Sequence, residues 1–282
     1  MKVYKGISEL RNTIASIKKN SRLIGFIPTM GYLHEGHVSL IRKARLDTDC
    51  VVVSIFVNPI QFGPKEDFKR YPRDLDRDLK LCKANAVDIV FAPEAESIFP
   101  EDFLTYVNVE GLSDVLCGSS RPGHFKGVTT IVAKLFNIVK PDIAYFGQKD
   151  AQQAVAVGRM VKDLNMPLRI RVMPTVREKD GLAMSSRNIY LKPEERKEAL
   201  SLYKSLKLAE ELYKKGERNP EAIISKMRNL ILRHRDLNID YISIVDINTL
   251  KTIDRISGKA LVAVAAWVGK TRLIDNVVLK EA

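Results

Sequence analysis

Two histidines stand three residues apart in the segment PTMGYLHEGH, residues 28–37. Because side chains three apart share one face of a helix, a single turn can direct the imidazoles of His34 and His37 toward one point. A helix that begins here would also present its first backbone N–H groups to the loop, which favours an anion. The spacing lacks the HExxH pattern of zinc peptidases, and no third metal ligand stands out. We expect an anion-binding site; the alternative is that both histidines are polar loop and capping residues.

Three later segments carry side chains suited to small anionic substrates. Gln61, in NPIQFG at 58–63, offers donors and acceptors for the hydroxyls and carboxylate of a polar acid. Lys149, in GQKD at 147–150, can place an ammonium against phosphates, and Arg187, in MSSR at 184–187, adds a planar fork. Each has a plainer interpretation: a loop glutamine bonded to backbone, a surface Lys–Asp pair and a helix-capping loop.

Taken in order, these segments resemble one known family. Residues 28–37 resemble the HxGH signature of the nucleotidyl-transfer superfamily, which includes nucleotidylyltransferases and class I aminoacyl-tRNA synthetases. More narrowly, the chain resembles the pantothenate synthetase (pantoate–β-alanine ligase) family over nearly its whole length. The further segments that carry this resemblance are SIFVNPIQFGP at 54–64, YPRDLDRDL at 71–79, RPGHFKGV at 121–128, YFGQKDAQQ at 145–153 and VREKDGLAMSSRN at 176–188.

The resemblance implies an ATP-dependent ligase that condenses pantoate with β-alanine. In the implied first step, the pantoate carboxylate attacks the α-phosphorus of ATP, which gives pantoyl adenylate and pyrophosphate. In the second step, the amine of β-alanine attacks this mixed anhydride and releases pantothenate and AMP. The implied ligands are ATP, Mg²⁺ and the two small acids, without a nucleic-acid or membrane partner. The family is typically a homodimer.

The resemblance also assigns roles to individual residues. His37, His34 and Lys149 would be catalytic, with His37 best placed as the proton-donating group. Gln61 and Gln153 would bind pantoate, and the neighbourhood of Gln61 would admit β-alanine. The implied ATP-binding residues are Met30, Gly31, Tyr32, Leu33, His34, Glu35, Gly36, His37, Gly147, Gln148, Lys149, Asp150, Val176, Met184, Ser185, Ser186 and Arg187.

A carboxylate for Mg²⁺ is implied in the segment YPRDLDRDL, and Asp78 aligns best with it. The expected helix start at this place would equally explain its aspartates as capping and dipole partners. Arg121 and His124, in RPGHFKGV, are further candidates for an anion site.

Composition limits the class of protein. With 45% hydrophobic and 28% charged residues, the 282-residue chain is of ordinary globular composition, which excludes a disordered protein. No apolar stretch approaches the ~18–20 residues that cross a bilayer, and the N-terminus lacks an apolar signal-peptide core. Three cysteines without a CxxC pair argue against a disulfide scaffold or a Cys-based zinc site, and Cys50 and Cys82 are expected in the core. We expect a cytoplasmic protein.

The formal net charge of +12 leaves two alternatives to weigh. An RNA-binding protein is disfavoured because the basic residues are scattered and only 7% of the chain is aromatic. A nucleotidylyltransferase that moves AMP onto a phosphorylated acceptor is disfavoured by the glutamine-bearing segment and the length of the resemblance. The excess charge would also steer small anions toward the protein.

Hydrophobic periodicity alternates strands with helices through the first part of the chain. The expected strands are 23–28, 50–57, 87–91, 105–109, 143–146 and 168–173, and the expected helices are 8–19, capped by Ser8, 37–45, 74–84, 128–139 and 151–164. Near-continuous apolar strands that alternate with helices are typical of a Rossmann-like, doubly wound parallel sheet covered on both faces. Ligands bind at the carboxyl ends of such strands, so the loops after residues 27, 57 and 146 should hold the chemistry.

The pattern changes near residue 175. Two amphipathic helices, 193–215 and 220–235, each begin with a proline, and the strands 241–245, 260–268 and 273–279 follow without intervening helices. We therefore expect two domains. Residues 1–175 would form the Rossmann-like ATP- and pantoate-binding domain, and residues 176–282 a smaller α+β lid domain with an antiparallel sheet.

Overall fold

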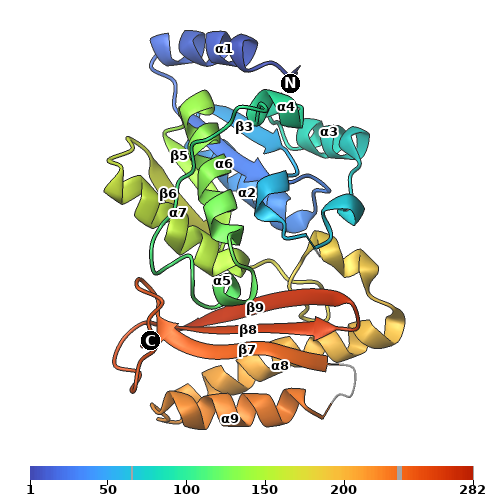
Figure 1. Ribbon diagram of the computed structural model, residues 1–282, viewed down its shortest axis with the longest axis vertical. Coiled ribbons are helices and arrows are strands. Elements are labelled where there is room, and N and C mark those ends of the chain that lie inside the picture. Colours follow the sequence, from blue (N-terminus) through green and yellow to red (C-terminus); the bar gives the residue numbers. More distant parts are fainter. Residues whose placement is uncertain (65, 234–236, 282) are drawn as a thin grey trace.

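The computed structural model describes residues 1–281, apart from residue 65 and residues 234–236. Within this part of the chain the strands form two separate sheets (Figure 1). The first is parallel, with the order β1-β4-β3-β2-β5-β6, which confirms the doubly wound sheet expected from the sequence. Its strands are β1 (Lys2–Tyr4), β2 (Ile24–Thr29), β3 (Cys50–Ile55), β4 (Ile89–Phe91), β5 (Ile143–Gly147) and β6 (Arg169–Met173).

Helices cover both faces of this sheet, because successive strand residues point to opposite sides. In β2, Phe26 belongs to a core shared with α1, α6 and α7, whereas Ile27 belongs to a core shared with α2 and α3. The helices of this part of the chain are α1 (Ile7–Lys19), α2 (Glu35–Asp47), α3 (Leu75–Ala84), α4 (Ala95–Ile98), α5 (Cys117–Ser120), α6 (His124–Val139) and α7 (Ala151–Asp163).

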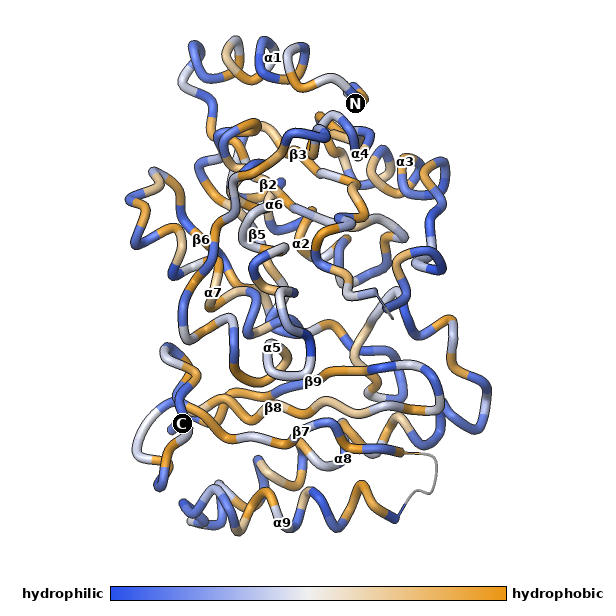
Figure 2. Tube along the Cα trace, viewed as in Figure 1, coloured by the Kyte–Doolittle hydropathy of each residue, from blue (hydrophilic) through white to orange (hydrophobic). Residues whose placement is uncertain are grey.

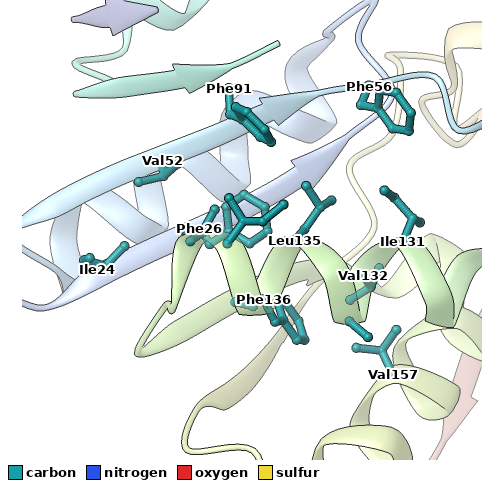
Figure 3. Close-up of a cluster of buried hydrophobic side chains, with 14 of the residues drawn as sticks. Ile24, Phe26, Val52, Phe56, Phe91, Ile131, Val132, Leu135, Phe136 and Val157 are labelled. Carbon is teal, nitrogen blue, oxygen red and sulfur yellow. The ribbon is translucent and has the colours of Figure 1, made fainter. Parts of the chain in front are cut away.

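The most apolar of these helices is α6, which lies against the sheet (Figure 3). Side chains from β2, β3 and α6, among them Phe26, Val52 and Leu135, meet in this core. The rings of Phe26 and Phe136 pack edge to face, with centroids 6.3 Å apart. The helix ends at Val139, because Lys140 adopts a left-handed conformation and Pro141 cannot continue it.

The winding of the sheet reverses at β2. From β2 the chain passes to β3 and β4 on one side, and it later returns to β5 and β6 on the other. Parallel strands end at the same edge of a sheet, so the segments that follow β2, β3 and β5 meet there. This edge is where the sequence predicts the chemistry.

The second sheet consists of β7 (Leu237–Asp246), β8 (Ala260–Val268) and β9 (Thr271–Leu279), paired antiparallel in that order. On one face, Val262 and Val264 of β8 pack with the helices α8 (Pro193–Lys214) and α9 (Pro220–Ile231). On the other face, Leu261 and Ala263 pack with Leu112 and Ala151 of the first part of the chain. Burial on both faces explains why β8 is apolar along almost its whole length.

Two predicted features differ from the structure. Residues 105–109 form no strand, because the backbone of Val107 is bonded to the hydroxyls of Thr129 and Thr130 on α6 instead of to a neighbouring strand. Ser8 lies inside α1, whose N-cap is Gly6, without a side-chain capping bond. The short β1 was not expected, and residues 234–235 at the end of the expected helix 220–235 lie outside the described residues.

Burial explains the cysteines and the amphipathic helices. Cys50 and Cys82 are both buried core residues, as the sequence predicts, and burial raises the pKa of Cys82 to about 12. Hydrophobic and hydrophilic residues alternate along the peripheral helices α1 and α9 (Figure 2). Among the described residues, no helix is both long and apolar enough to cross a membrane.

Candidate active site

The histidine segment forms a tight turn between β2 and α2. Gly31 and Tyr32 both have positive φ angles, of 83° and 49°. A Cβ atom at Gly31 would lie 3.0 Å from Ile55 Cγ2 and 3.1 Å from Asp78 Oδ2, so a side chain there would push on both neighbours as well as strain the backbone. His34 then caps the helix, because its Nδ1 accepts a hydrogen bond from the backbone N–H of Gly36 at 3.1 Å.

Hydrogen bonds from the backbone determine which nitrogen of each imidazole carries the proton. The Nδ1 atom of His37 accepts from the backbone N–H of His34 at 3.2 Å, and the two ring centroids are 4.1 Å apart. A neutral imidazole whose Nδ1 accepts must carry its proton on Nε2. Both rings therefore present an Nε2–H donor, and both histidines line a cleft at the carboxyl edge of the first sheet.

Electrostatics keep these rings neutral. Burial, together with the nearby Lys149 ammonium, lowers the pKa of His34 to about 4. Burial also holds the pKa of His37 well below its ordinary value, with further lowering from His34 and Lys149. At neutral pH the pair donates hydrogen bonds without carrying charge, while Lys149 supplies the positive charge beside it.

The cleft has a volume of about 200 Å³ and is continuous with a cavity of about 110 Å³ that reaches β8 and β9. Segments that are far apart in the sequence line both spaces, as the sequence predicts for the loops after β2, β3 and β5. The residues that line both are Met30, Gln61, Lys149, Asp150, Gln153, Ser185 and Arg187. The expected residues Gly36, Gly147, Val176, Met184 and Ser186 also line the larger cleft.

Gln61 is buried at the end of the short 3-10 turn Pro59–Gln61. Its Oε1 accepts from Asn58 Nδ2 at 2.9 Å, and its Nε2 lies 3.1 Å from the sulfur of Met30, so it joins the segments after β2 and β3. The turn packs directly on α6 at Gly127, where a Cβ would lie 2.4 Å from the carbonyl oxygen of Ile60. Only glycine allows this approach.

Arg121 and His124 support the same turn from the other side. His124 Nδ1 lies 2.8 Å from the carbonyl oxygen of Gln61, and Arg121 pairs with Glu66 and with His124 Nε2. Burial, together with the Arg121 charge, lowers the pKa of His124 to about 3. Both side chains line the smaller cavity, and their role at an anion site stays a prediction.

The two adjacent glutamines of α7 have different surroundings. The side chain of Gln152 is bonded to the backbone of Leu112, Val115 and Cys117, so its amide holds a neighbouring loop. Gln153 lines both spaces of the cleft. The ligand-binding role that the resemblance implies for Gln153 stays a prediction.

The MSSR segment is connected to both the histidine turn and the loop after β3. Ser186 Oγ donates to the carbonyl oxygen of Tyr32 at 3.2 Å. Arg187 forms two hydrogen bonds of 2.8 Å with the carboxylate of Asp67, and the backbone N–H of Met184 donates to Val176 at 3.0 Å. Burial raises the pKa of Asp67, but the bonds and charge of Arg187 outweigh it and leave that pKa below its usual range.

Five of the expected ATP-site residues do not line the cleft: Gly31, Tyr32, Leu33, Glu35 and Gln148. The first three form the turn behind it. Glu35 pairs with Arg42 on the exposed side of α2, and Gln148 is bonded through its side chain and carbonyl oxygen to Asn276 of β9.

The expected Mg²⁺ role does not fit the surroundings of Asp78. Its side chain is 1% exposed, and its two oxygens accept the backbone N–H groups of Tyr32 and Leu33, each at 2.7 Å. It does not line the cleft. In the described part of the chain, no group of three or more His, Cys, Asp or Glu residues is arranged to hold a metal ion.

The structure adds residues that the sequence interpretation did not single out. Asn58 is 1% exposed, lines the cleft and has an Oδ1 atom without a hydrogen-bond partner. Its place directly after a buried strand, in the same segment as Gln61, was an available signal. Two further residues, Arg272 and Tyr241, line the smaller cavity, and Asp240 pairs with Arg272. Nothing in the sequence connects these residues of β7 and β9 with loops more than 100 residues earlier.

A doubly wound sheet whose switch point carries two neutral imidazoles, a lysine and an arginine defines an α/β enzyme with a site for anions. The family model described as pantoate-β-alanine ligase matches residues 2–278. The chain belongs to the pantoate–β-alanine ligase family, whose reaction is the condensation of pantoate with β-alanine to pantothenate.

Curated relatives and solved structures agree with this assignment. The chain is 58% identical to pantothenate synthetase of Acetivibrio thermocellus over 99% of this chain and 100% of the relative, and 56% identical to that of Moorella thermoacetica over 99% of both. The crystal structure of the Thermus thermophilus pantothenate synthetase covers 98% of this chain and 99% of its own, at 44% identity and a TM-score of 0.93. The Francisella tularensis ligase, complexed with β-γ ATP and β-alanine, covers 99% and 97% at 34% identity and a TM-score of 0.82.

Proposed function

We propose that this enzyme activates pantoate with ATP as pantoyl adenylate and then transfers the pantoyl group to β-alanine. A pantoate carboxylate oxygen attacks the α-phosphorus, the bond from that phosphorus to the bridging oxygen breaks, and pyrophosphate leaves. The amine of β-alanine then attacks the carbonyl carbon and loses a proton, and AMP leaves. The F. tularensis ligase, complexed with β-γ ATP and β-alanine, supports these two ligands for this chain.

The observation that carries the proposal is the convergence of four donors on one cleft. His34 and His37 offer Nε2–H groups, and Lys149 and Arg187 offer positive charge. Phosphoryl-transfer chemistry depends mainly on positioning and on stabilisation of developing negative charge, and it needs no covalent nucleophile from the protein. We propose that these four side chains bind the phosphates and stabilise the departing pyrophosphate.

The acid and the amine are assigned to the neighbouring part of the cleft. Gln61 and Gln153 approach it from β3 and α7, and the unpartnered Oδ1 of Asn58 is a buried acceptor at the same place. An unpaired buried acceptor is costly unless a ligand donor reaches it. We propose that pantoate hydroxyls bind among these amides and that β-alanine enters beside Gln61.

We propose that residues 1–175 form the nucleotide- and pantoate-binding domain and residues 176–282 a lid. This boundary is supported by the end of the parallel sheet at Met173 and by the position of Leu182 in the second core. The lid carries the MSSR segment, so its closure would exclude water from the adenylate.

Mg²⁺ remains in the proposal as the counter-ion that accompanies ATP in solution, since Asp78 does not suit it as a ligand. We also propose a homodimer in the cytoplasm, which the family resemblance supports. Sedimentation velocity at micromolar concentration would test the dimer directly, because a sole species of 31.8 kDa would contradict it.

The products distinguish adenylation from its nearest chemical alternative. With pantoate, β-alanine and ATP, we expect pantothenate, AMP and pyrophosphate to form in equal amounts, measured by mass spectrometry and phosphorus NMR. Formation of ADP and inorganic phosphate would instead indicate an acyl phosphate and would contradict the proposal.

A further inference from the structure

Asp78 lies directly behind the paired histidines, on the first turn of α3. Its carboxylate is almost completely buried, and the two oxygens accept different backbone donors, the N–H groups of Tyr32 and Leu33. Both hydrogen bonds measure 2.7 Å, which is short for an N–H···O bond and typical of a charged acceptor. The carboxylate is therefore fully engaged with one turn of the backbone.

That turn needs outside support, because its conformation is unfavourable for its residues. Tyr32 has a φ of 49°, in the left-handed region that non-glycine side chains rarely adopt. Such residues persist only when the surrounding structure holds them. Here the guanidinium of Arg77, next to Asp78 on the same helix, also lies over the Tyr32 ring, 4.8 Å from its centroid.

The turn also sets the orientation of the reactive groups. Leu33, held by Asp78, directly precedes His34, whose backbone N–H donates to His37 and whose ring caps α2. The carbonyl oxygen of Tyr32 accepts from Ser186 of the MSSR segment. A displacement of the turn would therefore move both imidazoles and the serine contact together.

We propose that Asp78 is the positioning residue of the histidine turn, acting through the backbone of Tyr32 and Leu33. Because this inference rests on the proposed adenylation for its kinetic readout, its tests include measurements that do not depend on that function. This positioning role takes the place of the Mg²⁺-binding role that the family resemblance implied for Asp78.

The direct test compares Asp78→Asn with Asp76→Asn, an exposed aspartate on the same turn of α3. The amide introduced by D78N keeps one acceptor oxygen but turns its NH₂ group toward a backbone N–H. In pantoate-dependent ATP–pyrophosphate exchange, we expect D78N to lower kcat about 10²-fold, as a misplacement near 1 Å can. The Mg²⁺ concentration that gives half the maximal rate should stay near that of the wild type, and D76N should be indistinguishable from the wild type.

A metal ligand would behave differently in the same assay. If D78N needs much more Mg²⁺ to reach half-maximal rate and recovers full kcat at high Mg²⁺, Asp78 holds the metal and the proposal is wrong. A D78N enzyme with wild-type kcat at ordinary Mg²⁺ would overturn it as well.

Spectroscopy separates positioning from a general loss of stability. The chain has four histidines, so ¹⁵N NMR of labelled imidazoles is readily interpreted. In the wild type, the signals of His34 and His37 should show the Nε2–H form; in D78N, at a temperature where it remains folded, they should shift toward a mixture of tautomers. Unchanged imidazole signals in folded D78N would contradict the proposal.

The wild-type protein provides a test if D78N does not fold. We expect the amide protons of Tyr32 and Leu33 to exchange with deuterium as slowly as those of β2. Rapid exchange of these two amides would overturn the proposal. This measurement is independent of turnover, so absence of exchange activity in the wild type would count against the proposed function alone.

Discussion

The two imidazoles of the cleft are neutral donors, and this follows from their hydrogen bonds to the backbone. Each Nδ1 is occupied by a backbone N–H, so each Nε2 must carry the proton that faces the cleft. The expected proton-donating role of His37 is thus best understood as hydrogen-bond donation, because burial opposes a charged ring. A neutral donor can stabilise a developing phosphate charge without first losing a proton to it.

At this scale we predict the effect of removing one donor. His37→Ala should fold like the wild type and lower the rate of adenylation about 10²–10³-fold, as expected for the loss of one stabilising donor. His37→Gln, which places an amide N–H near the former Nε2 position, should recover part of the rate. Circular dichroism and ATP–pyrophosphate exchange measure both properties, and full turnover of His37→Ala would refute this role.

A second prediction concerns pH. The pKa of His34 is lowered from 6.5 to about 4, and that of His124 to about 3, so the unfolded chain binds more protons than the folded one in mild acid. The free energy of unfolding should therefore fall as the pH decreases from about 6.5 toward 4. Urea denaturation at several pH values tests this, and a smaller slope is expected for His124→Gln. A constant stability across this range would contradict the burial of these imidazoles in their neutral form.

The hydrophobic periodicity of the sequence was sufficient to predict the parallel sheet. In a parallel sheet the loops after β2, β3 and β5 lie at the same edge, so their meeting was predictable as well. The local sequence pattern gave wrong predictions where tertiary contacts determine the structure. Residues 105–109 have the composition of a strand, yet hydroxyls of α6 satisfy the backbone of Val107. Asp78 shows the same limit, because a carboxylate at a helix start has the same sequence pattern whether it meets a metal, a helix N-terminus or, as here, a buried turn.

The Asp67–Arg187 pair supports a prediction at the scale of elements. The carboxylate of Asp67 accepts hydrogen bonds from Nε and Nη2 of Arg187, and this fixes the MSSR segment beside the loop after β3. Asp67→Asn should raise the KM for ATP about tenfold, equivalent to about 1.4 kcal/mol, because Arg187 loses its orientation. Glu66→Gln, which acts on Arg121 instead, should leave that KM nearly unchanged. Equal KM values for ATP in Asp67→Asn and wild type would argue against this role for the pair.

The whole molecule joins its two sheets through a few polar contacts and one apolar cluster. Gln148 pairs with Asn276, and Leu261 packs beside Leu112. The sequence predicts both units but not this contact, because its residues are separated by about 100 positions or more and share no local pattern. Arg272 and Tyr241 of the second unit line the smaller cavity, and no local sequence pattern predicts this either.

We predict that the second unit closes over the cleft when ligands bind. The MSSR segment connects the second unit to the histidine turn, so ligands that bind both should draw the units together. Small-angle scattering with ATP and pantoate should show a smaller radius of gyration than the free protein. An unchanged radius under saturating ligands would exclude a closing lid.

The proposed acyl adenylation in this protein depends on four donors that meet in one cleft, His34, His37, Lys149 and Arg187. The most direct measurement is ATP–pyrophosphate exchange with Mg²⁺ and pantoate but without β-alanine. We expect ATP–pyrophosphate exchange that requires pantoate and that is nearly abolished in His37→Ala. A folded protein that binds ATP but shows no pantoate-dependent exchange would contradict the account and would favour transfer of AMP to a different acceptor.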